Sequence, residues 1–426
     1  MAEEYPLFGS TAPYAEPLWY SRNVTAHHKD SHRKLRATVR KYVDEDLRPY
    51  AFEWESAGRV VKRHAELGYQ ALATGLSNVR LPADIPFEEW DTWHSQIVND
   101  EMCRIGYSGV NWGLGGANGI GVPPIANFGN EEQKARFLPG VAAGEILFCL
   151  GITEPDAGSD VANIKTTAIR QGDHYVVNGA KKWITNAIWA DYVTAAVRTG
   201  GPGAAGISLL VIPLAAEGVR RRPMYNSGVG ASGSTFITFE DVHVPVANLI
   251  HKEGRGFEVI MSNFNPERRS IATSCIRLSR VCAEDAWNHA CTRETFGKKL
   301  IENPVIRAKF VRMGRMIEPA QAFLDQLTWL IELNRKGGRE NIRIGGMTAL
   351  LKVVCTRCLE KCVREAQQVM GGLGYAKGGK GGRIEAISRD VRVMAVGGGS
   401  EEIMSELSIR EEVKDLMKLA EASSKL

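Results

Sequence analysis

The chain has 426 residues, of which 44% are hydrophobic and 24% charged, and this composition excludes a largely disordered protein and allows about two to four domains. Its 53 basic and 49 acidic residues give a net charge of +4 and are interspersed, so no basic stripe predicts nucleic-acid binding. No apolar run approaches the roughly 18–20 residues of a membrane-spanning helix, and we expect a soluble protein.

The first part of the chain is predicted to be mainly helical. Residues 1–31 are rich in turn formers and aromatics without a clear period, and we interpret them as an N-terminal extension. An N-terminal helical domain is expected over residues 32–146. Its first helix carries apolar residues at helical spacing: Leu35, Val39, Tyr42, Val43 and Leu47. A later helix is predicted to begin after Asn130, a typical N-cap residue, and to end at Pro139 and Gly140.

The pattern changes over residues 147–251, where short apolar and β-branched segments are bounded by Gly, Asn and Pro. The segments are HYVVNG, YVTAAVRT, ISLLVIPL and STFITFEDVHVP, and they predict a small β domain. Helical periodicity resumes over residues 252–426, with long helices expected within 270–335 and 340–370. The order helices, strands, helices predicts an α+β protein with a β domain between two helical domains.

The cysteines form no disulfide framework of the secreted type, and no signal peptide precedes them. Cys355, Cys358 and Cys362 have spacings that put them on one face of a helix. A metal or cluster site would need a fourth ligand, and none occurs at a suitable spacing. We therefore interpret these three thiols as buried packing residues, expect no metal, and infer a reducing compartment.

The last three residues, Ser424, Lys425 and Leu426, match the address that directs proteins to peroxisomes when it stands at a free C-terminus. We expect a peroxisomal location if the source is eukaryotic, and a cytoplasmic one otherwise. The acidic start MAEEYPLF argues against an Arg-rich mitochondrial transit peptide.

Two stretches of the middle domain indicate ligand binding. In ITEPDAGSD, residues 152–160, hydroxyls and backbone N–H groups suit an oxygen-rich ring edge or a phosphate. In KKWITN, residues 181–186, Trp183 and Thr185 are spaced to lie on one face of a strand, where the indole can cover an aromatic ring. Alone, the first stretch is equally consistent with a surface turn, and the second with a core tryptophan.

Together the two stretches resemble the acyl-CoA dehydrogenase family of flavoenzymes. The resemblance extends over nearly the whole chain from about residue 30 and includes, in family order, NFGNEEQKARFLPGVAAGE, FEDVHVP, RETFGK, QVMGGLGY and RDVRVMAVGGGSEEI. It implies an N-terminal helical domain, a middle β-barrel-like domain and a C-terminal four-helix bundle. It also implies FAD as cofactor, an acyl-CoA substrate and a homotetramer built as a dimer of dimers.

The resemblance assigns one set of FAD contacts to the middle domain. Ile152 and Thr153 would meet the pyrimidine edge of the flavin. Ser159 would lie at the flavin phosphates or at the CoA entrance. Trp183 would lie against the isoalloxazine ring, and Thr185 would bond near its N5 atom.

Further contacts are implied in the C-terminal domain. Arg293 and Phe296 would reach the pyrophosphate and adenine of FAD in a neighbouring subunit, since an arginine fork matches two phosphate oxygens. Five more residues match positions near the ribitol and adenosine portions: Gln368, Gly371, Gly372, Ser400 and Glu402. One departure is Asn303-Pro304, where the family often has His-Gln, so a cofactor contact across the subunit interface is in doubt.

The expected chemistry needs a base. Dehydrogenation of a thioester at Cα–Cβ requires a carboxylate that removes the α-proton while hydride leaves Cβ for the flavin. Many family members carry this Glu in a turn that is Gly397–Ser400 here, and Gly398 at the matching position has no carboxylate. Glu401 and Glu402 follow, but Glu402 is assigned to the cofactor and Glu401 is expected to face solvent.

The isovaleryl-CoA and long-chain branches of the family also have glycine in this turn and take their base from another helix. This second resemblance implies Glu267, within NFNPERRSIA, as the base. Asn265 is expected to cap that helix, with Pro266 at its first position and Glu267 in its first turn. Without the resemblance, Glu267 is interpreted as an ordinary helix-stabilising residue. Arg268 matches a position that helps to hold CoA, whereas Arg269 is expected to face solvent.

Three functions follow. The leading one is a FAD-dependent dehydrogenase that makes a trans-2-enoyl-CoA and passes electrons to an electron-transfer flavoprotein or to O2. The second is a relative that acts on a nitroalkane or hydroxylates an aromatic compound, which the presence of Glu267 opposes. The third is a catalytically inactive CoA-binding protein, which the retained Thr153, Trp183, Thr185 and Arg293 oppose.

Overall fold

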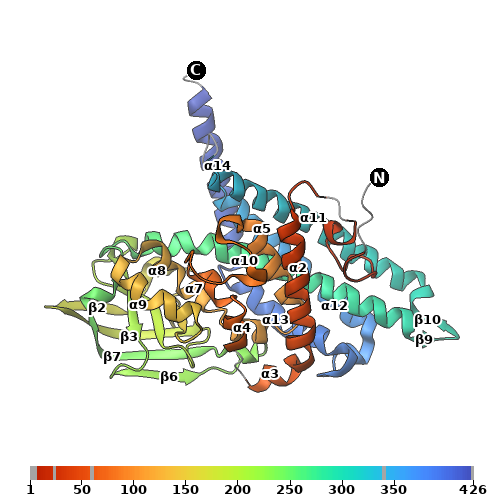
Figure 1. The fold of residues 1–426 in the computed structure, drawn as a ribbon, viewed down its shortest axis with the longest axis horizontal. Coiled ribbons are helices and arrows are strands. Elements are labelled where there is room, and N and C mark those ends of the chain that lie inside the picture. The colour runs from red at the N-terminus through yellow and green to blue at the C-terminus, as the bar shows by residue number, and fades with distance from the viewer. Residues whose placement is uncertain (1–6, 23–24, 58–61, 338–341, 424–426) are drawn as a thin grey trace. The chain divides into compact units, whose positions relative to one another are not determined.

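The computed structural model describes residues 7–22, 25–57, 62–337 and 342–423 (Figure 1). Ser424, Lys425 and Leu426 lie outside the described residues, as do parts of the 1–31 extension. The chain forms two compact units. The sheet unit comprises Glu53–Glu89 and Ser108–Glu267, and the helical unit comprises Met1–Phe52, Trp90–Tyr107 and Arg268–Leu426.

The sheet unit contains an eight-stranded sheet, counted over the described residues, with the order β6-β7-β3-β2-β4-β5-β8 and with β1 paired in parallel to β4. Figure 1 labels β6, β7, β3 and β2 of this sheet. The strands are β1 (Phe148–Gly151), β2 (Thr167–Gln171), β3 (His174–Ile184), β4 (Tyr192–Arg198), β5 (Ile207–Pro213), β6 (Val219–Pro223), β7 (Thr235–Pro245) and β8 (Leu249–Ile250). The four segments predicted as strands are found in β3, β4, β5 and β7, which confirms those predictions.

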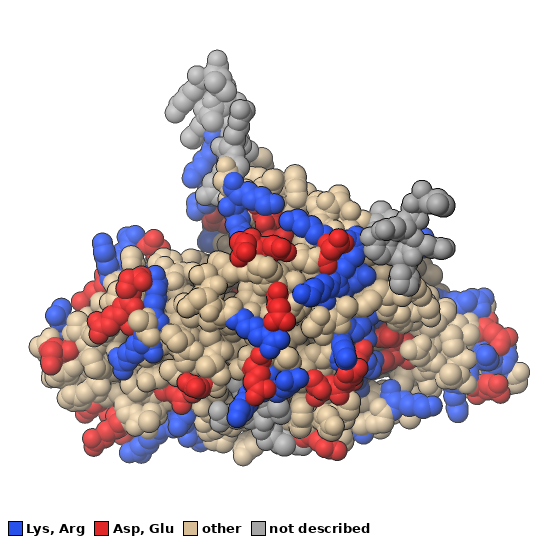
Figure 2. Space-filling model, viewed as in Figure 1, with Lys and Arg blue, Asp and Glu red and all other residues tan. Residues whose placement is uncertain are grey.

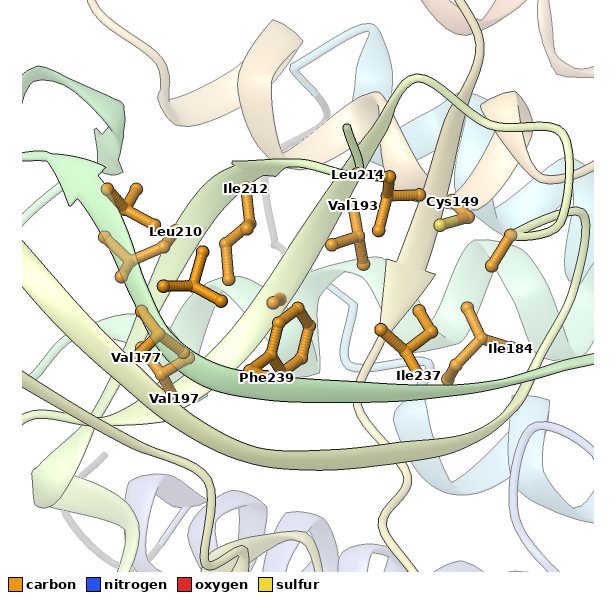
Figure 3. Close-up of a cluster of buried hydrophobic side chains, with 14 of the residues drawn as sticks. Cys149, Val177, Ile184, Val193, Val197, Leu210, Ile212, Leu214, Ile237 and Phe239 are labelled. Atoms are coloured by element: carbon orange, nitrogen blue, oxygen red, sulfur yellow. The ribbon is translucent and has the colours of Figure 1, made fainter. Parts of the chain in front are cut away.

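Buried side chains cover both faces of the sheet, and one of the two clusters is drawn in Figure 3. Side chains from β3, β4, β5 and β7 gather in that cluster, and Val193, Ile212 and Phe239 are buried among them (Figure 3). Five successive residues of β4, from Val193 to Val197, are buried, so this strand is covered on both faces. A strand covered on both faces is a continuous apolar run in the sequence, as YVTAAVRT is.

Short helices complete the sheet unit: α4 (Lys62–Glu66), α6 (Ser108–Gly113), α7 (Asn118–Gly121), α8 (Pro123–Phe128) and α9 (Glu131–Ala142). Asn130 caps α9 as predicted, because its side chain accepts a hydrogen bond of 2.8 Å from the N–H of Gln133. The predicted end at Pro139 is wrong. The helix continues to Ala142, because a proline removes only its own N–H and its carbonyl still accepts from Ala143 at 3.0 Å.

Seven α-helices lie wholly within the helical unit, counted over the described residues. They are α1 (Leu18–Ser21), α2 (Asp30–Tyr42), α5 (Thr92–Met102), α11 (Pro304–Arg335), α12 (Gly345–Met370), α13 (Gly382–Val396) and α14 (Glu401–Ser423). A two-stranded hairpin of β9 (Glu294–Thr295) and β10 (Lys298–Lys299) follows α10, while α3 (Ala51–Ala57) and α10 (Gly256–Thr292) run through both units. Helical N- and C-terminal regions with a sheet between them confirm the α+β prediction.

The N-terminal extension contributes to the core of the helical unit. Glu16 is buried, and its carboxylate accepts hydrogen bonds from Arg40 at 2.7 Å and from Arg277 at 2.8 Å. Burial alone would raise the pKa of Glu16, but these two guanidinium groups lower it to about 2. The extension is therefore fixed to α2 and α10 through its charged groups.

The three clustered cysteines are packing residues of α12. Cys355, Cys358 and Cys362 are buried with free thiols, and the Sγ atoms of Cys358 and Cys362 are 3.9 Å apart. The expectation of buried helix cysteines is confirmed.

Charged side chains of both signs occur on the surface. Basic and acidic side chains are interspersed on the face of the molecule drawn in Figure 2. Within the described residues, none of the helices is both long and apolar enough to cross a membrane.

Candidate active site

The loop after β1 carries the first predicted ligand contacts. Ile152 is buried and Thr153 half-buried, while Gly158 and Ser159 are exposed. Glu154 and Ala157 pair across a tight turn, with the N–H of Glu154 donating to the Ala157 carbonyl at 3.0 Å. Open space surrounds Gly158, since a Cβ built there meets no atom within 4 Å. The turn predicted from ITEPDAGSD is therefore present and open at its glycine.

The structure brings this loop to the end of β3. The N–H of Lys182 donates to the carbonyl of Thr153 at 2.9 Å. Trp183 is the next residue and its side chain is 52% exposed. Thr153 and Trp183 are 30 positions apart in the sequence, and this backbone bond makes their segments neighbours in space.

The expectation that Trp183 and Thr185 project from one strand face is wrong. The pairing of β3 with β7 shifts register between Lys181 and Ile184, and Trp183 has φ +64°. Strict alternation of side chains does not survive such a bulge. Thr185 lies in the turn after the strand and is half-buried, and Asn186 fixes that turn through its Nδ2 atom, 2.9 Å from the carbonyl of Ser232.

A buried ion pair joins the two segments, and sequence reasoning missed it. Lys181 is fully buried, and its Nζ donates to Glu154 Oε1 at 2.7 Å and to the Ile152 carbonyl at 3.1 Å. Burial lowers the pKa of Lys181 to about 8, although Glu154 acts in the opposite direction. The sequence contains Glu154 in TEP and Lys181 in KKW, which could have indicated an ion pair. A lysine in a strand usually faces solvent, however, so the pair was not expected.

The helix that carries Glu267 begins earlier than predicted. Helix α10 starts at Gly256 and passes through Pro266, so Asn265 does not cap it and Glu267 is not in its first turn. Val259 and Ile260, before Pro266 in the chain, are buried in a core cluster of the sheet unit. This packing keeps the chain helical from Gly256 onward. Glu267 is therefore too far from the helix N-terminus to be stabilised by the helix dipole.

The Glu267 carboxylate is held from one side by an amide. Asn263, one helical turn earlier, donates from Nδ2 to Glu267 Oε1 at 2.7 Å and to the Ile120 carbonyl at 3.0 Å. Asn263 is buried and Glu267 half-buried. The bond to Ile120 fixes the amide's orientation, so Asn263 presents a donor to the carboxylate and stabilises its ionised form.

The glycine turn of the helical unit disfavours a residue with a side chain. Gly398 has φ +66°, a region that side-chain-bearing residues rarely adopt, and a Cβ built there would lie 2.9 Å from Ile271 Cδ1. Arg268 is buried and donates from Nε to the Gly398 carbonyl at 3.0 Å. Arg268 therefore holds this turn, which sequence reasoning did not assign to it.

A second buried cation supports the same turn. Lys352 of α12 is fully buried, and its Nζ donates to the Gly399 carbonyl at 2.8 Å and to the Ala395 carbonyl at 2.5 Å. Burial lowers the pKa of Lys352 to about 8, with Cys275 acting in the opposite direction. A lysine at the C-terminal end of α13 complements that helix's dipole. Sequence reasoning missed Lys352, since nothing around it in the sequence distinguishes it from a surface lysine.

The two glutamates after the turn have surface partners. Glu401 pairs with Arg357 at 2.5 Å and is partly exposed, close to the expected solvent position. Hydrogen bonds from its own N–H and from the Ser400 hydroxyl lower the pKa of the exposed Glu402. Ser400 and Glu402 are thus brought together at the start of α14. Glu401 is engaged by a guanidinium and Glu402 is exposed, which opposes a role of either as the base.

Arg269 differs from its expectation. It was predicted to face solvent, but it is half-buried, and burial lowers the pKa of its guanidinium to about 10. Nearby Glu332 acts in the opposite direction. Its position on α10, one residue after the buried Arg268, turns it toward the other helices of its unit.

The predicted contacts to a neighbouring subunit lie on a hairpin. Arg293 and Phe296 are exposed at β9 and β10, and Phe296, at φ +51°, is fully exposed at the tip.

Asn303 and Pro304, which stand where the family often has His-Gln, form the start of α11. Asn303 Oδ1 accepts from the N–H of Val305 at 3.0 Å and caps α11, and Pro304 occupies its first turn.

The QVMGGLGY stretch ends α12 in an open turn. Gln368 is exposed near the end of the helix, and Gly371 terminates it with φ +59°. A Cβ at Gly371 or Gly372 would meet no atom within 4 Å. These three residues therefore border free space within the helical unit.

A separate histidine cluster has the composition of a metal site but not its hydrogen bonds. Ligand atoms of His32, Asp91 and His94 lie within 4.8 Å of one another. The Nδ1 atom of His32 accepts from the Lys29 N–H at 2.8 Å, so its Nε2 carries the proton and donates to Asp91 at 3.0 Å. A donor nitrogen does not bind a metal. The cluster is better explained by capping of α5, where Asp91 accepts from the N–H of His94.

Family models match consecutive parts of the chain. The N-terminal domain of acyl-CoA dehydrogenase matches residues 29–145, the middle domain 149–242 and the C-terminal domain 254–412. Over 422 residues the chain is 49% identical to the acyl-CoA dehydrogenase AFT10-1 of Alternaria alternata, which covers 96% of this chain and 98% of that protein.

Solved structures show the same likeness. A probable acyl-CoA dehydrogenase from Mycobacterium abscessus is 33% identical with a TM-score of 0.81, covering 90% of this chain and 99% of its own. An acyl-CoA dehydrogenase from Bacillus anthracis, complexed with FAD, is 27% identical with a TM-score of 0.81, covering 92% of this chain and 69% of its own.

Proposed function

Since the chain belongs to the acyl-CoA dehydrogenase family, whose members are FAD-dependent oxidoreductases, we propose that it converts an acyl-CoA thioester to the trans-2-enoyl-CoA with Glu267 as the base. The observation that carries this assignment is the 2.7 Å hydrogen bond by which Asn263 orients the Glu267 carboxylate. The backbone at Gly398 supports it, because its φ of +66° disfavours the glutamate that many relatives place there.

The residues present fit FAD. Trp183 offers a half-exposed indole, and open space surrounds Gly158, Gly371 and Gly372, where backbone can approach a ligand closely. The residues that would hold the cofactor are Ile152, Thr153, Ser159, Trp183, Thr185, Arg293, Phe296, Gln368, Gly371, Gly372, Ser400 and Glu402. When bound, FAD accepts the hydride that leaves Cβ of the substrate.

Glu267 then has one task, to take the proton from the α-carbon. Asn263 keeps Oε1 engaged, which orients the second carboxylate oxygen and limits the rotation of the side chain. A carboxylate held in one rotamer loses less freedom on reaching the transition state than a mobile one. Arg268 follows in the chain and is assigned to holding the CoA part, together with Ser159.

The acceptor, location and assembly complete the proposal. We propose peroxisomal import through Ser424, Lys425 and Leu426 if the source is eukaryotic, with electrons passing to O2 or to an electron-transfer flavoprotein. The exposed Arg293 and Phe296 support an assembly in which each hairpin serves a neighbouring subunit, as in a homotetramer made of two dimers.

Anaerobic titration of the purified holoenzyme tests the function. Saturated acyl-CoAs of several chain lengths are added while the visible flavin absorbance is followed, and one or more are expected to bleach it. Readmission of air with a peroxide assay then separates O2 from a protein acceptor. Bound flavin that no thioester bleaches would overturn the dehydrogenase proposal and favour a substrate without CoA, and purification without flavin would favour a CoA-binding protein.

A further inference from the structure

The buried pair Glu154–Lys181 occupies an unusual position in the sheet unit. Lys181 lies inside the unit near the end of β3, two residues before the exposed Trp183. Its ammonium donates at 2.7 Å to Glu154 and at 3.1 Å to the Ile152 carbonyl, so one side chain contacts both ends of the Ile152–Glu154 segment. Thr153 stands between these two contacts.

Two backbone N–H groups also donate hydrogen bonds to the carboxylate of Glu154. The N–H of Lys165 donates to Oε2 at 2.5 Å and that of Thr166 donates to Oε1 at 3.0 Å. Burial alone would raise the pKa of Glu154, but the charge of Lys181 and these hydrogen bonds lower it. The pair therefore closes the whole loop from residue 152 to residue 166 onto β3.

The attachment of this loop to β3 also fixes Thr153 and Trp183, the two residues expected at the flavin. Lys181 donates to Ile152 and to Glu154, the residues on either side of Thr153. The N–H of Lys182 donates to the carbonyl of Thr153 itself. The bulge that gives Trp183 its left-handed φ begins at Lys181, where the ammonium contact anchors the strand. A shift of Lys181 would thus move Thr153 and Trp183 relative to each other.

Stability does not explain why a charged pair occupies this place. Two ions lose their hydration on burial, and apolar residues of similar volume are often equally or more stabilising. The pair instead supplies directional bonds to the Ile152 carbonyl and to the N–H groups of Lys165 and Thr166. An apolar pair would leave those backbone groups to find other partners, and the segment would lose its fixed position.

We propose that Glu154 and Lys181 are positioning residues that set the placement of Thr153 against Trp183, and thereby the affinity and the spectrum of bound FAD. The inference rests on the proposed function, because it concerns the same cofactor. Neither residue touches substrate in this account. Their effect passes through the two neighbours that they hold.

The test is the double variant Glu154→Gln/Lys181→Met, which removes both charges and leaves no unpaired ion. FAD is removed and added back, and the dissociation constant and the visible absorption and circular dichroism spectra of the flavin are measured. We expect the dissociation constant to rise about tenfold or more, the loss equivalent to one or two positioning hydrogen bonds, with a shifted flavin spectrum. The exposed pair Asp156–Lys165 of the same loop provides the control Asp156→Asn/Lys165→Met, which is expected to change neither value.

The outcomes separate the two proposals. A double variant that binds FAD with wild-type affinity and spectrum overturns the positioning role and leaves the dehydrogenase proposal intact. A wild-type protein that binds no FAD overturns the proposed function itself. If the double variant does not fold, Glu154→Gln alone decides by the same measurements, because it removes the charge that raises the pKa of Lys181 and leaves only the burial that lowers it.

Discussion

At Gly398 the backbone itself opposes a side chain. Its φ is +66°, and a Cβ would lie 2.9 Å from Ile271 Cδ1 and 3.7 Å from Arg268 Cγ. Restoring a glutamate there would have to overcome both the conformation and the contact. Glu267, in contrast, sits within a continuous helix beside a fixed amide donor. The two positions differ in backbone, and not only in side chain.

The substitution Gly398→Ala is expected to lower the free energy of unfolding by about 1–2 kcal/mol for the left-handed conformation, with a further loss from the contact with Ile271. Gly172→Ala is the matched control, since Gly172 has φ +62° and open space around it. Urea unfolding of both variants measures the difference. An equal or smaller loss at Gly398 would contradict the crowded turn.

The half-buried His28 predicts acid sensitivity. Burial lowers the pKa of His28 from its ordinary 6.5 to about 3, with His32 and His27 acting in the same direction, Asp91 against them, and Arg36 adding a small further lowering. The unfolded chain therefore binds a proton that the folded protein does not. Stability contributed by the neutral ring is complete above pH 6.5 and is lost as the pH falls below it, by about 1–2 kcal/mol at pH 5.

The measurement is the free energy of unfolding at pH 7 and pH 5 for wild type and for His28→Phe, which keeps the ring that stacks on Trp19 at a centroid distance of 3.8 Å. The variant is expected to show a smaller difference between the two pH values. An unchanged pH dependence would show that His28 does not titrate as its burial implies.

Residue-level prediction succeeded where the local pattern was decisive. Asn130 caps α9 as its sequence context indicates, whereas Asn265, before a proline, does not begin a helix. The difference lies in what precedes each residue. Val259 and Ile260 are buried and extend α10 upstream, and a cap signal is overridden where tertiary burial continues the helix.

At the scale of elements, the turn between α13 and α14 is held from two helices. Arg268 of α10 and Lys352 of α12 each donate to a carbonyl of Gly398 or Gly399. Both cations are buried, so their hydrogen bonds have no competing water. The turn is fixed even though it carries no base, which is consistent with the proposed role of the adjacent Ser400 and Glu402 as cofactor contacts.

Removing the second cation is expected to loosen this turn. Lys352→Met takes away donors from the Ala395 and Gly399 carbonyls and should cost about 1–3 kcal/mol of stability. Lys361→Met, at an exposed position of the same helix, is the control and should be nearly neutral. Denaturant unfolding compares them, and equal stabilities of the two variants would show that Lys352 supports nothing.

Strands were easier to predict than their irregularities. The apolar, β-branched segments located β3, β4, β5 and β7, because their composition suits a buried sheet. The bulge before Ile184 was not visible, since it depends on how β3 pairs with β7, 50 or more residues away. The strand-face argument for Trp183 and Thr185 failed for this reason, although the segment itself was placed correctly.

At the scale of the whole molecule, the contacts that unite distant segments could not be predicted. Glu16 and Arg277 are 261 positions apart and form a buried ion pair, and nothing in either local sequence indicates the partner. The family resemblance supplied the fold class because it carries such pairings implicitly. It did not supply Lys181 or Lys352, whose roles follow only from coordinates.

The role of Glu267 as the base is tested by the rate at which an acyl-CoA bleaches the flavin of a variant that lacks this carboxylate. The holoenzyme and its Glu267→Gln variant are mixed anaerobically with the best acyl-CoA, and the first-order rate of flavin bleaching is recorded. Glu258→Gln, an exposed position of the same helix paired with Arg255, is the matched control. The account predicts that Glu267→Gln keeps thioester binding but slows bleaching by about 10²–10⁴-fold, while Glu258→Gln bleaches at the wild-type rate. Bleaching of the Glu267→Gln variant at the wild-type rate would rule out Glu267 as the base and leave Glu401 and Glu402 as the candidates.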